Sequence, residues 1–141
     1  MGTLKTKIMV FGTFDGLHQG HLNFFKQARR LSDHPFLIVS IARDKNVQKI
    51  KKIKPTLNEK KRLLLVKKCI LVNRVVLAGL IRHIPHITKE RPDIIALGYD
   101  QKNYIQNLKK DLQNKGLLVK IVRLKPYKKH ILKNHLLKKR R

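Results

Sequence analysis

One stretch of the sequence decides the expected fold: Gly12-Thr13-Phe14-Asp15-Gly16-Leu17-His18-Gln19-Gly20-His21. It follows an apolar run at residues 8–11 that is typical of a buried strand, and it leads into residues 19–31, where apolar side chains recur at helical spacing. A strand that ends at a helix N-terminus favours phosphate binding, because free N–H groups and the positive end of the helix dipole face one point. We expect His18 and His21 to face that point from one side of the helix, and Gly12 and Gly20 to let the backbone approach the phosphate.

Strand and helix patterns alternate along the rest of the chain. A capping box at residues 56–59 predicts a helix ending near residue 68, and Gly116 is expected to end another. We expect strands at 36–42, 75–78, 94–97 and 118–124, and further helices at 84–90 and 101–115. This alternation predicts an α/β fold with a doubly wound parallel sheet, whose ligand lies at the switch point beside the first strand.

Length and composition set the class of protein. A chain of 141 residues is expected to form one domain, here residues 1–125, completed by a basic helix or tail at 126–141. No apolar run approaches the roughly 18 residues of a membrane span, and the N-terminus lacks a secretory pattern. The single Cys69 is expected to be a core or half-buried thiol, and we predict a soluble, cytoplasmic protein.

The charge of the chain is strongly positive. Lys and Arg number 34 against 8 acidic residues, which gives a net charge of +26. Two explanations stay open, namely binding of nucleotide, pyrophosphate or RNA, and general lysine enrichment on solvated faces. Basic residues are dense at 125–141, and we expect weak, sequence-independent RNA binding there.

The first motif resembles the G-T-F-D-x-x-H-x-G-H signature of the nucleotidylyltransferases, specifically their cytidylyltransferase-like branch, and every fixed position is present. A second segment, Gly98-Tyr99-Asp100-Gln101, resembles the G-Y-D-Q motif of archaeal-type FAD synthases. The resemblance runs from about residue 7 to about residue 124. It implies a Rossmann-like fold and transfer of a nucleoside monophosphate from a nucleoside triphosphate to a phosphate acceptor, with release of pyrophosphate.

The resemblance favours ATP and FMN as substrates, with Mg²⁺ bound together with the nucleotide. The competing enzymatic hypothesis is a cytidylyltransferase acting on CTP and glycerol 3-phosphate or another small phosphate ester. A third hypothesis is a non-catalytic relative that binds nucleotide or RNA. Homodimers are common in this family, so the resemblance also implies a possible homodimer.

Residue roles follow from the same resemblance. His18 and His21 are the expected catalytic residues, because charge on the α-phosphoryl oxygens needs hydrogen-bond donors. Asp15 is expected either to orient the acceptor or Mg²⁺ or to cap the helix, and Asp100 either to contact the nucleotide or to cap the helix at 101–115. No metal site made from the protein alone is expected. The nucleotide-binding residues implied are Gly12, Thr13, Phe14, His18, Gln19, Gly20, His21, Arg62, Asp100 and Arg123.

The C-terminal segment departs from the family pattern. Relatives commonly place a serine- and threonine-rich turn after the equivalent of Arg123, where hydroxyls and amides hold the triphosphate. Residues 124–135 contain no serine or threonine, and Asn134 and His135 stand at the aligned place. We expect this departure to weaken triphosphate binding more than chemistry.

Overall fold

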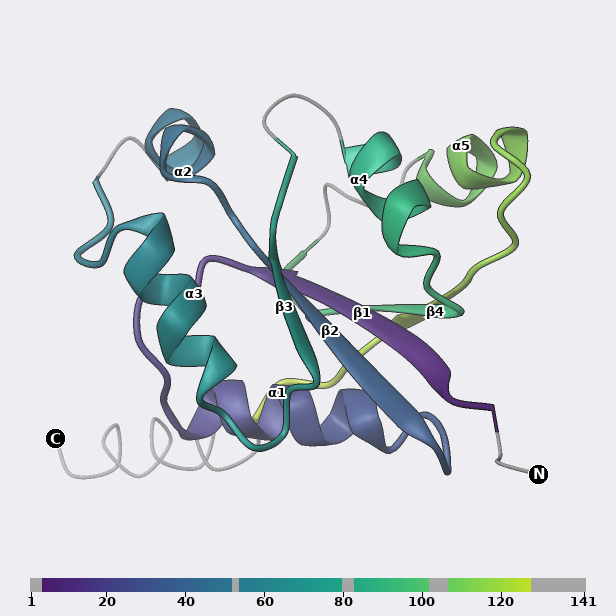
Figure 1. The fold of residues 1–141 in the computed structure, drawn as a ribbon, viewed down its shortest axis with the longest axis horizontal. Helices are drawn as coiled ribbons and strands as arrows, with labels where there is room; N and C mark the ends of the chain where they lie inside the picture. The colour runs from purple at the N-terminus through teal and green to yellow at the C-terminus, as the bar shows by residue number, and fades with distance from the viewer. Residues whose placement is uncertain (1–3, 52–53, 80–82, 102–106, 128–141) are drawn as a thin grey trace, which may run out of the picture.

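The computed structural model describes residues 4–51, 54–79, 83–101 and 107–127. Its centre is a five-stranded sheet in the order β3-β2-β1-β4-β5, and every pair of neighbours is parallel (Figure 1). The strands are β1 (Thr6–Gly12), β2 (Pro35–Ile41), β3 (Arg74–Leu77), β4 (Ile94–Leu97) and β5 (Lys120–Arg123). Strand order reverses at β1, so the predicted doubly wound sheet and its switch point are confirmed.

Helices cover both faces of the sheet. They are α1 (Gln19–Arg29), α2 (Asp44–Lys51), α3 (Glu59–Lys67), α4 (His83–Glu90) and α5 (Leu108–Asn114). Alternate residues of β1 point to opposite faces. Figure 1 shows α1 and α3 on one face of the sheet and α4 and α5 on the other. Ile8 and Val10 join a core with side chains of α1 and α3, while Met9 and Phe11 join a second core with side chains of α4 and α5. The continuous apolar strands are therefore explained by burial on two sides.

Most predicted elements are confirmed, and three details needed correction. Helix α2 was not predicted, because its eight residues include only two apolar ones, Val47 and Ile50, although these stand at helical spacing. The N-cap of α3 is Asn58, whose side chain accepts the Lys61 N–H at 2.9 Å, rather than Thr56. Among the described residues, α5 begins at Leu108 with Asn107 as its N-cap, so Asp100 does not occupy the position directly before it.

Other expectations are confirmed. Gly116 follows α5 with a φ of +76°, a conformation that glycine adopts readily. Cys69 is half-buried and packs against the core that contains Val66. Within the described ranges, none of the helices combines the length and the apolar character needed to cross a membrane.

Candidate active site

The carboxyl ends of β1, β2 and β4 meet at one edge of the sheet, and the two motifs meet there with them. Gly12 at the end of β1 accepts the backbone N–H of Ala42 at 2.9 Å. From the other side, the Gln101 side chain reaches the Phe11 carbonyl, with its Nε2 at 2.8 Å from that oxygen. The first motif therefore lies between the end of β2 and the G-Y-D-Q segment, as the topology predicts.

His18 and His21 are brought together at the start of α1. His18 is the N-cap, and its Nδ1 accepts the Gly20 N–H at 3.0 Å. The Nδ1 of His21 accepts the backbone N–H of His18 at 3.2 Å, which completes a capping box made of two histidines. The rings stack with their centroids 3.8 Å apart and their planes at 27°.

The capping box fixes which ring nitrogen carries the proton. A neutral imidazole has one donor and one acceptor nitrogen, so a ring that accepts at Nδ1 carries its hydrogen on Nε2. Burial, together with the nearby His18, lowers the pKa of His21 to about 4, so this ring is neutral at neutral pH. No acidic residue lies in the first turn of α1, which leaves the positive helix end free for an anion.

The two motif glycines are required by ring packing. A Cβ built on Gly12 would lie 2.6 Å from ring atoms of Phe14, and one built on Gly20 would lie 2.8 Å from Cε1 of His18. We predicted that these glycines let the backbone approach a phosphate. The structure adds a second reason for glycine at both positions, because aromatic rings fill the space that a Cβ would take, and the approach to a phosphate stays a prediction.

Phe14 shapes the motif loop. Its φ of +53° is uncommon for a residue other than glycine, and its ring is buried against Phe25. The ring also meets the His21 imidazole edge to face, with centroids 5.3 Å apart. The conformation of this loop and the position of His21 are therefore linked through one aromatic contact.

Asp15 binds backbone N–H groups far along the chain. Its two carboxylate oxygens accept the N–H groups of Thr56 and Leu57, each at 2.7 Å. These bonds, that of Leu57 first, lower the pKa of Asp15, so the side chain is anionic at neutral pH. The alternative in which Asp15 caps α1 is wrong, because His18 occupies that position.

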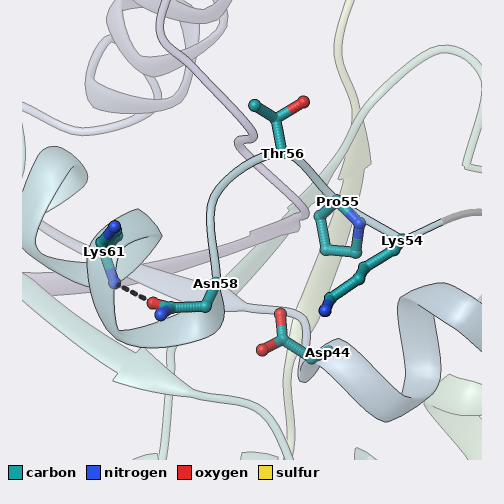
Figure 2. A pocket seen from close by; sticks show the side chains of 6 residues that line it. All are labelled: Asp44, Lys54, Pro55, Thr56, Asn58 and Lys61. Carbon is teal, nitrogen blue, oxygen red and sulfur yellow. Dashed lines mark hydrogen bonds between the residues drawn. The ribbon is translucent and has the colours of Figure 1, made fainter.

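A basic hollow adjoins the Asp15 contact. It has a volume of about 200 Å³ and lies between the start of α2 and the segment leading into α3 (Figure 2). Lys54 and Lys61 are both exposed beside it. The lining residues are Asp44, Lys54, Pro55, Thr56, Asn58 and Lys61.

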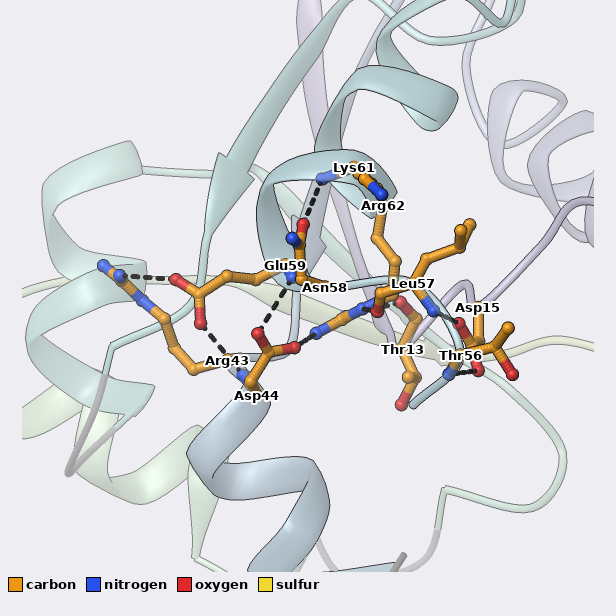
Figure 3. Close-up of polar contacts among 10 residues, drawn as sticks. All are labelled: Thr13, Asp15, Arg43, Asp44, Thr56, Leu57, Asn58, Glu59, Lys61 and Arg62. Carbon is orange, nitrogen blue, oxygen red and sulfur yellow. Dashed lines mark hydrogen bonds and ion pairs between the residues drawn. The ribbon is translucent and has the colours of Figure 1, made fainter. Parts of the chain in front are cut away.

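Arg62 lies in the interior rather than on the surface. Its exposed fraction is 0%, and its guanidinium donates to the carbonyls of Leu57 at 3.1 Å and Thr13 at 2.8 Å. Its Nη2 pairs with Asp44 Oδ1 at 2.7 Å (Figure 3). We predicted that Arg62 faces the triphosphate, and this position corrects that expectation, since the guanidinium is enclosed and bound to protein groups.

Asp44 and Glu59 join the two helices that follow β2. The Glu59 carboxylate accepts the backbone N–H of Asp44 at 3.0 Å, and the Asp44 carboxylate accepts that of Glu59 at 3.1 Å. Burial alone would raise the pKa of Asp44, but the hydrogen bond and charge of Arg62, with the Glu59 N–H, lower it overall. Arg43 pairs with Glu59 at 3.2 Å and donates to the Ala78 carbonyl. Because Arg43 follows β2 and Ala78 follows β3, this hydrogen bond connects the carboxyl ends of the two strands.

The G-Y-D-Q segment is held by side chains that the sequence did not reveal. Gln101 accepts the Gly98 N–H at 2.8 Å while it donates to the Phe11 carbonyl, so it ties β4 to β1. Arg123, at the end of β5, donates to the carbonyls of Gly98 at 2.8 Å and Tyr99 at 3.2 Å. Tyr99 is 54% exposed and Asp100 is exposed, so both remain accessible at this edge.

Two further expectations concern metals and the C-terminal turn. In the described part of the chain, no group of three or more His, Cys, Asp or Glu side chains is arranged to hold a metal. Asn134 and His135 lie outside the described residues.

Comparison with known proteins gives a consistent result. A family model described as cytidylyltransferase-like matches residues 9–136. The FAD synthase of Korarchaeum cryptofilum is 46% identical over 119 residues, covering 84% of this chain and 80% of the relative. The FAD synthase of Methanosarcina mazei is 42% identical over 123 residues, covering 87% and 79%.

Solved structures agree on the fold. The crystal structure described as a lipopolysaccharide core biosynthesis protein from Thermoplasma volcanium has a TM-score of 0.79 at 34% identity, covering 86% of this chain and 98% of that one. A protein of unknown function from Archaeoglobus fulgidus has a TM-score of 0.66 at 16% identity, covering 85% and 90%, which shows a shared fold alone. With the histidine pair, the switch-point sheet and these relatives together, the chain belongs to the cytidylyltransferase-like family and is a nucleotidyltransferase.

Proposed function

We propose that this protein is an FMN adenylyltransferase that makes FAD and pyrophosphate from ATP and FMN. One structural observation carries the proposal: two stacked imidazoles present Nε2–H donors at the N-terminus of α1, which has no acidic residue in its first turn. The similarity to curated FAD synthases at 42% and 46% identity supports the choice of substrates.

The reaction requires alignment and charge stabilisation more than an enzyme nucleophile. A phosphate oxygen of FMN attacks the α-phosphorus of ATP, the bond from that phosphorus to the oxygen bridging to the β-phosphate breaks, and pyrophosphate leaves. The Nε2–H groups of His18 and His21 donate to the α-phosphoryl oxygens as negative charge shifts onto them and the leaving group. Since FMN phosphate is already ionised at neutral pH, neither histidine has to accept a proton.

Mg²⁺ is proposed to enter with the nucleotide. This ion prefers oxygen ligands and keeps several waters, so phosphate oxygens supply a suitable set with few protein ligands. When bound, Mg²⁺ neutralises charge on the triphosphate.

The remaining nucleotide contacts are proposed from their place at the carboxyl edge. Thr13, Phe14 and Gln19 belong to the motif loop and the first turn of α1, where backbone N–H groups can meet phosphate oxygens. Gly20 lies in the same turn, but its N–H already donates to Nδ1 of His18. Asp100 is exposed beside them and is proposed to accept hydrogen bonds from the ribose or base. Arg123 is proposed to act at the same edge, on the turn that carries Asp100.

A substrate panel tests the proposal. Pyrophosphate release is measured with ATP, CTP or GTP against FMN or glycerol 3-phosphate, and products are separated to identify FAD. We expect ATP with FMN to give the highest kcat/KM, and Mg²⁺ removal with EDTA to abolish the reaction. Preferential use of CTP with glycerol 3-phosphate would establish the competing cytidylyltransferase hypothesis instead. Binding of nucleotide without any transfer would establish the non-catalytic one.

Homodimer formation stays a prediction from the family resemblance. Sedimentation equilibrium tests it directly, with a mass near 33 kDa expected for two copies of the 16.5 kDa chain.

A further inference from the structure

The backbone of Leu57 is held on both sides, by one side chain from the motif loop and by one from α3. Its N–H donates to Asp15 Oδ1 at 2.7 Å, and its carbonyl accepts Nε of Arg62 at 3.1 Å. The same guanidinium donates to the Thr13 carbonyl at 2.8 Å. Asp15 and Arg62 therefore join the motif loop to the segment before α3 (Figure 3). Asp15 accepts hydrogen bonds from backbone N–H groups, and Arg62 donates hydrogen bonds to backbone carbonyls.

An ion pair with Asp44 also fixes the Arg62 guanidinium. Asp44 pairs with it at 2.7 Å, and the carboxylate of Asp44 is itself held by the Glu59 N–H at 3.1 Å. A guanidinium keeps its charge in proteins, so an enclosed one is stabilised only by such partners. Arg62 cannot leave this position without exposing or unpairing buried groups. The function of Arg62 therefore lies in the backbone groups that it binds, the carbonyls of Leu57 and Thr13.

The motif loop needs such support because of Phe14. A positive φ at a residue other than glycine is strained and persists only where the surroundings enforce it. Phe14 lies between the two tethered positions, Thr13 and Asp15, and its φ is +53°. Its ring meets His21 with a centroid separation of 5.3 Å. The tethers thus act on His21 through one side chain.

We propose that Asp15 and Arg62 are positioning residues of the transfer site, which hold Phe14 in the conformation that sets His21 for hydrogen bonding to the α-phosphate. The inference rests on the proposed function of the histidine pair. It differs from a role for Arg62 as a triphosphate ligand and from a role for Asp15 as a ligand of Mg²⁺. Both of those roles require direct contact, whereas positioning acts through the loop.

Three substitutions separate these roles. Arg62→Lys keeps the charge but loses the fork that reaches Thr13, Leu57 and Asp44 together. Asp15→Asn keeps one acceptor oxygen and puts an NH₂ group against a backbone N–H, at an exposed position where folding is expected to survive. Arg74→Lys is the matched control, since it weakens an arginine–carboxylate pair with Glu90 of the same 2.7 Å length at the other end of the sheet.

The first readout is the titration of His21, followed by NMR without substrate. Loss of the Phe14 contact exposes the ring, so in Arg62→Lys and Asp15→Asn we expect the pKa of His21 to rise from about 4 by about one unit or more toward its ordinary 6.5. Arg74→Lys should leave the His21 titration as in the wild type. Unchanged His21 titration in both test variants overturns the proposal, whatever the substrates prove to be. If Arg62→Lys does not fold, Asp15→Asn decides.

The second readout is kinetic. Misplacement of a donor by about an ångström costs up to ~10²-fold, so kcat is expected to fall about 10- to 100-fold in both test variants, with the KM for ATP changed less than about threefold. A raised KM with unchanged kcat would instead mark Arg62 as a direct ligand of ATP. Restoration of Asp15→Asn activity by excess Mg²⁺ would mark Asp15 as a metal ligand. Either result contradicts positioning.

Discussion

The backbone N–H of His18 donates to Nδ1 of His21 at 3.2 Å, so the residue that caps helix α1 is itself held by the second histidine of the motif. The His18 ring in turn accepts the Gly20 N–H, and each ring keeps its Nε2 for a ligand. Helix initiation and presentation of hydrogen-bond donors are therefore performed by the same two side chains.

Replacement of His18 separates its two roles. Asparagine is a good N-cap, whereas alanine is poor. We expect both His18→Asn and His18→Ala to lower kcat by ~10²-fold, because each removes a donor to the α-phosphate. His18→Ala should also lower the unfolding free energy by ~1 kcal/mol, whereas His18→Asn should keep most of the stability of the wild type. Steady-state kinetics and urea unfolding measure the two effects, and wild-type turnover in His18→Asn would show that the imidazole is not catalytic. His21→Ala is expected to lower kcat by a similar factor.

Stability should depend on pH through His21. The pKa of this group is about 4 in the folded protein and near 6.5 when unfolded, so the unfolded chain binds more protons between these values. The unfolding free energy should therefore fall as pH falls from about 6.5 to about 4. Urea unfolding across that range should show a shallower dependence for His21→Gln than for the wild type. His34→Gln is the control for loss of an exposed imidazole, and equal slopes in wild type and His21→Gln would contradict the assignment.

Gly20→Ala should damage the site despite the helical position of this residue. Alanine in a helix interior normally stabilises by ~0.5–1 kcal/mol relative to glycine. Here its Cβ would meet Cε1 of His18 at 2.8 Å and Nδ1 at 3.0 Å, so the ring has to move. We expect kcat to fall and the melting temperature not to rise. In a His18→Ala background the obstruction is gone, so adding Gly20→Ala should then raise the melting temperature. Additive effects in this double-mutant cycle would argue against a steric cause.

Gln101 is expected to matter for stability. Gln101→Glu keeps an acceptor for the Gly98 N–H but turns the donor toward Phe11 into a second carboxylate oxygen facing a carbonyl. The unfolding free energy should fall by ~1–3 kcal/mol at neutral pH. Gln113→Glu, at an exposed position on α5, is the matched control and should change stability by less than about 0.5 kcal/mol. Equal urea midpoints for the two variants would show that the hydrogen bonds of Gln101 to Gly98 and Phe11 do not stabilise the fold.

RNA binding by residues 125–141 is tested by truncation after residue 127, where the described structure ends. Each phosphate neutralised by a lysine or arginine releases a counterion, so binding should weaken steeply with salt. Fluorescence anisotropy with a random-sequence RNA should show a smaller salt slope for the truncated chain. Identical binding by both chains at every salt concentration would exclude a role for the tail.

The fold and the centre of the site were predictable because local patterns specify them. The continuous apolar run of β1 and the fixed spacing of His18 and His21 place the first strand, the turn and the helix start within the first 21 residues. Strand order then follows from the rule that parallel connections are right-handed and short. Nothing beyond neighbouring residues is needed for these predictions.

The parts that were missed depend on contacts between distant positions. Helix α2 buries Val47 and is joined at its first residue to Glu59, which lies 15 positions further along. Arg62 is enclosed because Thr13 and Asp44 bind it, from 49 and 18 positions away. A periodic pattern carries no information about such partners, so Arg62 was expected to bind the nucleotide, and Asp15 was expected to orient the acceptor or Mg²⁺ or to cap α1.

The use of a histidine as the N-cap of α1 constrains how this protein can evolve. A lineage that no longer needs the transfer reaction still needs residue 18 to satisfy the Gly20 N–H. Drift at residue 18 is therefore expected to favour asparagine, aspartate, serine or threonine over apolar residues, while Gly20, freed from the ring, can become any good helix former. Descendants that have lost the chemistry should be recognisable by that paired change, even where the surrounding motif is retained.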